Sequence, residues 1–293
     1  TDESWGAPLD TGLEFVQWDS YKVGGAPLPW VSHPNNVKNF FDTGIQQSNT
    51  LSMMSGNDTS SMRLSIGNSD EKGMVPSTDF KKVNVGFNGT TKFGEKLTAG
   101  ANVNYVNSKS NNLPSGGYDA KNIMGQFVWS ARNVNFPDLR DWENLPLAPN
   151  GTPLNWNNNY NNNPYWTLDT NRNTFDQDRF TGSTFLNYKF SNAFSANGKL
   201  SIDNYSQRER AIYAQGTTDA SGDYVNGYYT ETNRRYSEIN LEGIVTYNKQ
   251  LSENFKLQLN AGANTMKRVR NTISGTLPAL ELPDLYTLSN LAT

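Results

Sequence analysis

Hydrophobic and polar residues alternate along several segments of the chain, and short polar turns join these segments in pairs. In the clearest pair, the turn Gly94-Glu95-Lys96 separates two such runs, and Asn, Gly, Thr and Lys occupy most of the intervening positions. The apolar positions of this pair are Val83, Val85, Phe87, Phe93, Leu97, Val103 and Tyr105. A period of two is typical of a β-strand with one apolar and one polar face.

The same plan recurs along the chain and predicts four β-hairpins. They cover residues 46–68, 79–108, 178–206 and 233–270. Their strands are close to the ~9–11 residues that a tilted strand needs to cross a bilayer. The predicted fold class is therefore all-β: an antiparallel up-and-down sheet of about eight strands, forming a segment of a transmembrane β-barrel.

The connections between the hairpins are much longer than the turns within them. We expect a long extracellular loop at 109–177 with a helix at Asp119–Arg132, a loop at 1–45 with a short helix at Pro34–Phe41, and a closing loop at 271–293. Short turns at one end and long loops at the other are typical of outer-membrane barrels. Soluble domains rarely contain structureless connections of this length.

The alternation also predicts which side chains meet lipid and which meet water. We expect the lipid-facing positions to include Val85, Phe87, Leu186, Leu200, Leu241, Val245, Leu257 and Leu259. Rings beside the short turns would form the aromatic girdle: Phe93, Tyr188, Phe190, Phe194, Tyr247 and Phe255. A soluble β-sandwich remains open, because its strands also alternate, with one face in a dry core.

Composition narrows the function classes. Of 293 residues only 35% are hydrophobic, yet 12% are aromatic, and aromatic residues are scarce in disordered chains. The net charge of −3, without a Lys/Arg run, predicts no nucleic-acid partner. The chain has no cysteine and a single histidine, His33, so thiolate or histidine metal sites and a Ser-His-Asp triad are not expected.

The acidic residues do not single out a catalytic pair. Asp176, Asp178, Glu209 and Glu231 lie near predicted strand ends, without a spacing that selects two of them as the carboxylates of a glycosidase. We therefore predict no enzyme activity, no catalytic residues, no metal and no cofactor.

The long loop combines asparagine-rich runs with aromatic rings. Amide groups beside flat rings suit the binding of sugars or peptides, which predicts ligand contacts among Trp129, Trp142, Trp156, Tyr165 and Trp166. The alternative is that these rings pack a large loop onto the barrel mouth, since buried aromatic residues usually serve packing.

A series of short motifs resembles SusC/RagA-like TonB-dependent transporters. In order they are Glu3-Ser4-Trp5-Gly6, Asn35–Gly44, Arg63 to Asp79 (RLSIGNSDEKGMVPSTD), Leu97–Ser110, Trp129–Val134, Asn163–Trp166, Asp178-Arg179 with Gly182, and Leu285–Asn290. They span nearly the whole chain in the expected order, and the order makes the resemblance specific.

The resemblance implies an outer-membrane location and a role in nutrient import. Family members carry a plug, a TonB box and a 22-stranded barrel, so we expect residues 1–293 to be an internal barrel fragment. The implied partners are a SusD-like surface lipoprotein, the TonB complex, outer-membrane lipid, and an oligosaccharide or peptide cargo. Two alternatives remain: a soluble or surface carbohydrate-binding, adhesin-like β-domain, and a secreted polysaccharide-degrading enzyme.

Overall fold

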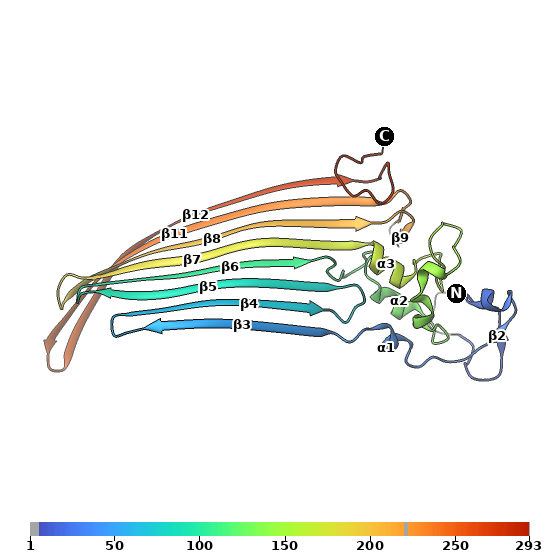
Figure 1. The fold of residues 1–293 in the computed structure, drawn as a ribbon, viewed down its shortest axis with the longest axis horizontal. Coiled ribbons are helices and arrows are strands. Elements are labelled where there is room, and N and C mark those ends of the chain that lie inside the picture. The colour runs from blue at the N-terminus through green and yellow to red at the C-terminus, as the bar shows by residue number, and fades with distance from the viewer. Residues whose placement is uncertain (1–5, 220–221, 293) are drawn as a thin grey trace.

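Eight long strands form one antiparallel sheet in which sequence neighbours pair throughout (Figure 1). The computed structural model describes residues 6–219 and 222–292, so Glu3, Ser4 and Trp5 of the opening motif lie outside the described residues. The strands are β3 (Ile45–Gly56), β4 (Ser60–Lys72), β5 (Asp79–Phe93), β6 (Leu97–Ser110), β7 (Arg172–Lys189), β8 (Phe194–Tyr213), β11 (Tyr228–Ser252) and β12 (Phe255–Leu277). The predicted all-β up-and-down topology is confirmed, and the sheet is that of a barrel segment.

The strands of the later hairpins extend well past the predicted ranges. The segment predicted at 178–206 forms β7 and β8 from residue 172 to 213, and that at 233–270 forms β11 and β12 from 228 to 277. Beyond the apolar stretch, polar pairs such as Thr232 with Ser274 continue the ladder. Polar cross-strand pairs stabilise strand segments that have no apolar face. The ranges predicted from hydrophobic alternation alone are therefore too short for these strands.

All the longer connections gather at one end of the sheet (Figure 1). This end holds the smaller elements β1 (Glu14–Phe15), β2 (Leu28–Pro29), α1 (Asn36–Phe40), α2 (Met124–Trp129), α3 (Pro164–Thr170), β9 (Thr217–Asp219) and β10 (Gly222–Tyr224). Short 3-10 helices occur at Ser20–Val23, Phe136–Leu139 and Trp142–Asn144. The opposite end carries only the turns at 57–59, 94–96, 190–193 and 253–254.

The helix predicted at Asp119–Arg132 is shorter than expected. Only Met124–Trp129 is α-helical. Before it, the side chain of Asp119 accepts a hydrogen bond from the Lys121 amide at 2.8 Å, and that of Asn122 accepts one from the Met124 amide at 3.2 Å. Such local hydrogen bonds from side chains compete with the backbone hydrogen bonds of a helix. The α-helix therefore begins only at Met124.

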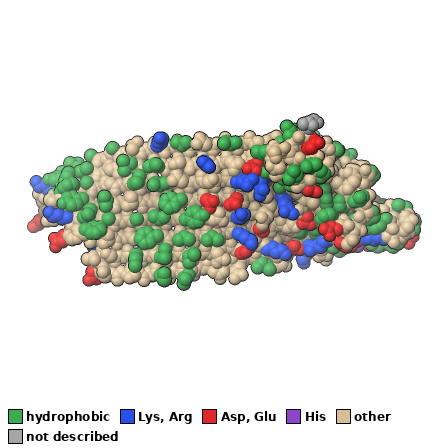
Figure 2. Space-filling model, turned by 45° about the horizontal axis from the view of Figure 1, so that its top comes forward, with side chains coloured by type: hydrophobic (Ala, Val, Ile, Leu, Met, Phe, Trp, Pro, Cys, Tyr) green, Lys and Arg blue, Asp and Glu red, His purple; other side chains and the backbone are tan. Residues whose placement is uncertain are grey.

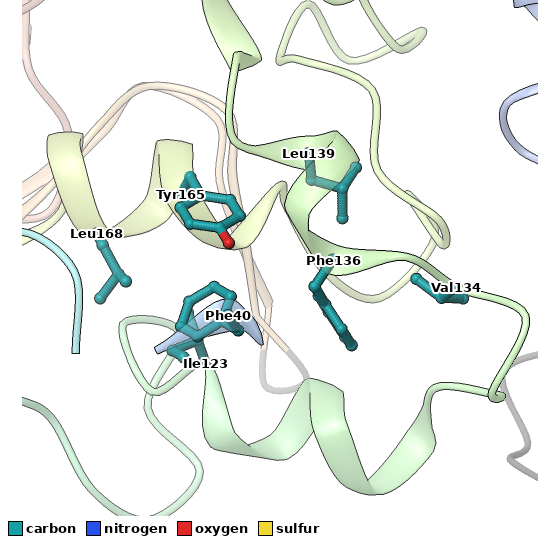
Figure 3. Close-up of a cluster of buried hydrophobic side chains, with 7 residues drawn as sticks. All are labelled: Phe40, Ile123, Val134, Phe136, Leu139, Tyr165 and Leu168. Carbon is teal, nitrogen blue, oxygen red and sulfur yellow. The ribbon is translucent and has the colours of Figure 1, made fainter. Parts of the chain in front are cut away.

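A small hydrophobic core lies at the loop end of the sheet, where Ile212, Tyr229 and Leu277 pack with Leu280. The larger core lies among the loops. Figure 3 shows its side chains converging from α1, the long loop and α3: Phe40, Ile123, Val134, Phe136, Leu139, Tyr165 and Leu168. Phe40, Phe136 and Leu139 are fully buried. The loops are therefore a packed unit at one end of the sheet.

The middle of the sheet has no comparable cover. Leu186, Leu241 and Leu259 are 56%, 53% and 56% exposed. Figure 2 shows hydrophobic side chains spread over the open surface of the strands. A soluble β-sandwich would bury these residues between two sheets, so the structure contradicts the sandwich alternative for the described chain. Separately, no helix within the described residues is long and apolar enough to cross a membrane.

Candidate solute-facing wall and loop pocket

The register places all eight predicted lipid-facing residues on the same side of the sheet. Residues directly opposite in neighbouring strands point to one side, and Leu241 lies opposite Leu200, while Leu186 lies opposite Ala99. We call this side the apolar face, defined by Val85, Phe87, Leu186, Leu200, Leu241, Val245, Leu257 and Leu259. Leu200 and Leu257 are half-buried and the other six are exposed.

The height of the apolar face matches the core of a bilayer. Along β8, ten residues separate Phe194, beside the turn, from Asn204, where polar groups begin. At ~3.3 Å per residue this is about 33 Å along the strand, or about 25 Å vertically for a strand tilted by ~40°. Lys267 on the edge strand β12 also lies on this face, opposite Ile239, and its long stem can reach toward the polar end.

The opposite side, which we call the polar face, carries a network of charged and aromatic groups over β7, β8, β11 and β12. Arg179 donates to both carboxylate oxygens of Asp203, from Nε at 2.9 Å and from Nη2 at 2.6 Å. Glu238 accepts bonds from the Tyr236 hydroxyl at 2.5 Å and from Arg268 Nε at 2.8 Å. The two hydrogen bonds between Arg179 and Asp203 fix the orientation of both side chains. These groups therefore hold defined positions on the polar face.

Two stacked tyrosines lie at the centre of this network. The rings of Tyr205 and Tyr236 are 5.0 Å apart between centroids and 15° from parallel. We call the set Arg179, Asp203, Tyr205, Tyr236, Glu238 and Arg268 the polar wall. Beyond it, Glu209 pairs with Arg234 and accepts a bond from Gln207 at 2.6 Å.

The sequence analysis missed the polar wall, although a signal for it was present. Arg179, Asp203 and Tyr205 lie at odd-numbered positions of β7 and β8, and Tyr236 and Glu238 lie at even-numbered positions of β11, so the period of two places the residues of each strand on one face. The sequence of a single strand does not show which charges meet across strands. The pairing of four strands brings the charges together.

The acidic residues considered for glycosidase chemistry do not form a joint site. Glu209 lies opposite Thr232, and Glu231 lies opposite Arg210, so the two carboxylates point to opposite faces. Asp176 pairs with Lys109 at 3.1 Å, and Asp178 accepts a bond from the Tyr105 hydroxyl at 2.5 Å. Each carboxylate has a partner of its own.

The asparagine-rich tract of the long loop is structural to a large degree. Asn163 is fully buried and caps α3, accepting bonds from the amides of Tyr165 at 3.0 Å and Trp166 at 3.2 Å. Its Nδ2 donates to the Leu139 carbonyl at 2.9 Å. Buried backbone groups require such hydrogen-bond partners. The side-chain amide of Asn163 therefore bonds the backbone of the loop and does not face a ligand.

Two of the five predicted ligand-contacting rings are core residues. Tyr165 and Trp166 are 4% and 7% exposed, and Tyr165 lies 4.7 Å from Phe40 between ring centroids. Burial raises the pKa of the Tyr165 phenol above its ordinary value. The prediction of ligand contact is corrected for these two rings, because tight packing keeps them from the surface.

The other three predicted rings differ in accessibility. Trp142 and Trp156 pack against the loop core, and Trp142 Nε1 donates to Asp169 Oδ2 at 2.9 Å. Trp129 is 52% exposed and lines a pocket of about 260 Å³. Tyr118 and Tyr160, both exposed, line the same pocket. We call this the loop pocket, defined by Tyr118, Trp129 and Tyr160.

No metal site is present among the described residues. The structure brings no group of three or more His, Cys, Asp or Glu side chains together in a metal-binding arrangement within 6–219 and 222–292. The backbone amide of His33 donates to the Arg132 carbonyl at 2.7 Å, which ties the N-terminal segment to the long loop.

Comparison with known proteins identifies the fold. No protein-family model matches the chain, and no curated protein matches it in sequence. A structure of the RagAB peptide transporter matches with a TM-score of 0.69 and 17% identity, over 88% of this chain and 28% of that chain. The RagAB peptide importer in its closed-closed state matches with 0.68 and 16%, over 92% and 29% of the two chains.

A third match is the RagAB peptide importer in its open-open state, with a TM-score of 0.68 and 19% identity, over 88% of this chain and 28% of that chain. The chain thus spans less than a third of the length of the RagAB chains that it matches. The likeness shows a SusC/RagA-like fold.

Proposed function

We propose that this chain forms part of the barrel of a SusC/RagA-like TonB-dependent transporter in the bacterial outer membrane. The observation that carries the proposal is the pair of unlike faces: an uncovered apolar face about 25 Å tall and a polar face bearing the polar wall. In this proposal lipid covers the first and a water-filled lumen meets the second.

The packed loop end gives the proposed transporter a surface for partners. The loops lie at the end opposite the short turns, the end that faces the cell exterior in outer-membrane barrels. A SusD-like lipoprotein would dock there, and the TonB complex would act from the periplasmic side. The packing of α1, the long loop and α3 into one core supports such docking, since rigid surfaces lose less entropy on binding.

The cargo of this proposed transporter is an oligosaccharide or a peptide. The exposed rings of the loop pocket suit the apolar faces of sugars. The alternating charges of the polar wall and the peptide cargo named for the RagAB structures support a peptide. Uptake of labelled oligosaccharides and labelled peptides by cells with and without the intact gene separates the two.

The membrane location has a direct test. The full-length protein is expected to stay in the outer-membrane fraction until detergent is added, and to purify with a surface lipoprotein. Recovery in the soluble fraction without detergent would contradict the proposal and revive the carbohydrate-binding alternative.

Removing a ring from the polar wall is expected to weaken cargo transport without preventing assembly. Tyr205→Ala deletes one half of the stacked pair, which lies on the proposed lumen side. A contact worth about 1 kcal/mol changes an affinity about fivefold, so the half-saturating cargo concentration should rise by about that factor. Uptake kinetics with the preferred cargo measure it.

A matched variant separates the lumen from the lipid side. Tyr188→Ala also removes a tyrosine ring from the sheet, but from the apolar face. It should leave the half-saturating concentration unchanged. Equal effects of the two variants would show that the polar wall does not contact cargo.

A further inference from the structure

A hollow with both apolar and polar lining interrupts the apolar face where that face gives way to charged residues. The hollow measures about 520 Å³ and lies across β6, β7, β8, β11 and β12. Phe180 and Val269 line it in the row nearer the turns, and Arg235 and Asn271 line it one row nearer the loops. Figure 2 shows Lys, Arg, Asp and Glu gathering where the strands approach the loops.

The register fixes the chemistry of the hollow. Ser237 lies opposite both Asn204 and Val269, and Arg235 lies opposite both Ser206 and Asn271. All of these residues share the apolar face with Leu241. On this face the hollow therefore presents one guanidinium, two amides, three hydroxyls (Ser206, Ser237 and Tyr105) and the carboxylate of Asp178, directly above hydrocarbon side chains.

Among the described residues, Arg235 lacks the acidic partner that several neighbouring arginines have. Arg179, Arg208, Arg234 and Arg268 each pair with a carboxylate. Arg235 is exposed, and within the described part of the chain its side chain has neither an ion pair nor a hydrogen bond.

The other polar groups of the hollow differ in whether they already have a hydrogen-bond partner within the chain. The carboxylate of Asp178, which also lines the hollow, already accepts hydrogen bonds from the Tyr105 hydroxyl at 2.5 Å and from Asn107 Nδ2 at 3.0 Å. Asn204 Oδ1 is buried without a partner. The hollow thus has hydrogen-bonding capacity that the folded chain does not use.

The position of the hollow indicates which kind of molecule can bind in it. It lies on the apolar face, so a solute moving along the polar face does not reach it. It lies about 25 Å above the aromatic residues beside the short turns, at the level where the hydrocarbon core of a bilayer meets the headgroups. A guanidinium binds phosphate oxygens with charge-assisted hydrogen bonds, and Phe180 and Val269 offer contact to acyl carbons.

We propose that Arg235, with Asn204, Ser206 and Asn271, binds the phosphate of a membrane-lipid headgroup whose acyl chains run along Phe180 and Val269. This inference rests on the proposed function, because it requires the apolar face to meet lipid. The lipid would be held at the loop end, which is the outer leaflet in the proposed orientation.

The test measures lipid retained by the full-length protein purified in a non-ionic detergent. The probe is phosphatidic acid, which carries a phosphate monoester, with phosphatidylcholine as the neutral comparison, counted by native mass spectrometry. Arg235→Gln should lower the affinity for phosphatidic acid about tenfold, the weight of one hydrogen bond to a charged group. Arg235→Lys, which keeps the charge but loses the planar fork, should fall between.

The matched control is Arg268→Gln, which removes an arginine from the polar face and should leave lipid affinity unchanged. Unaltered phosphatidic acid binding by Arg235→Gln would overturn the proposal. Competition by inorganic phosphate at the same concentration would also overturn it, in favour of a site for soluble anions. Assembly of each variant is followed by its heat-dependent migration in gels.

The failure of this inference can be told apart from failure of the proposed function. If the unaltered protein assembles in the outer membrane and Arg235→Gln still retains the lipid, only the headgroup site is wrong. If the unaltered protein is recovered without detergent, the membrane assignment itself is wrong.

Discussion

Replacing Leu241 by arginine is expected to prevent most of the protein from assembling in the outer membrane. Leu241 lies in the middle rows of the apolar face, opposite Leu200. Its side chain is 53% exposed, so the chain itself has room for the larger residue. An arginine that meets lipid near the midplane of a barrel costs about 2–4 kcal/mol, whereas a surface substitution in water usually costs within about 0.5 kcal/mol.

The adjacent residue provides the control for this prediction. Asn240→Arg places the same side chain on the same strand but on the polar face. It should assemble as the unaltered protein does. Quantifying heat-modifiable barrel in outer-membrane fractions compares the two variants, and equal assembly would contradict a lipid-facing position for Leu241.

Truncating Phe136 to alanine is expected to unfold the loop unit while the sheet remains intact. Phe136 is fully buried, and its ring lies 4.8 Å from Phe127 and 6.1 Å from Phe40 between centroids. Deleting a buried phenylalanine side chain costs about 3–5 kcal/mol. This cost falls on the local stability of the loop unit, because its core is separate from the apolar face.

Limited proteolysis of the assembled protein measures this effect. Phe136→Ala should be cut within residues 111–171 at far lower protease concentrations than the unaltered protein. Trp129→Ala, which removes a larger but 52% exposed ring from the same loop, should change the cutting little. Similar protection of both variants would contradict the existence of a stabilising loop core.

The fold was predictable because its main signal is local. Alternation along Val83 to Tyr105 reports which side chains share a face, and the short turn at 94–96 makes the two strands neighbours. Pairing of consecutive hairpins then gives the sheet order without long-range information. The eight residues expected to meet lipid share one face for the same reason.

The candidate site was less predictable because it depends on contacts across distance. Arg179 and Asp203 belong to different strands of a hairpin, and Tyr236 reaches Tyr205 only through the pairing of β8 with β11. In the long loop, the signal in Tyr165 and Asn163 was composition alone. Composition does not distinguish an amide that binds a ligand from one that caps a helix. In the structure Asn163 is fully buried and caps α3.

The opposite exposure of the two faces is tested most directly by spin labels at residues 241 and 240. This sequence has no cysteine, so single cysteines introduced into a cysteine-free full-length protein label only the chosen positions. In native outer membranes, a label at 241 should collide mainly with lipid-soluble oxygen, and a label at 240 mainly with a water-soluble nickel complex. Access of the nickel complex to both labels alike would contradict the assignment of the apolar face to lipid.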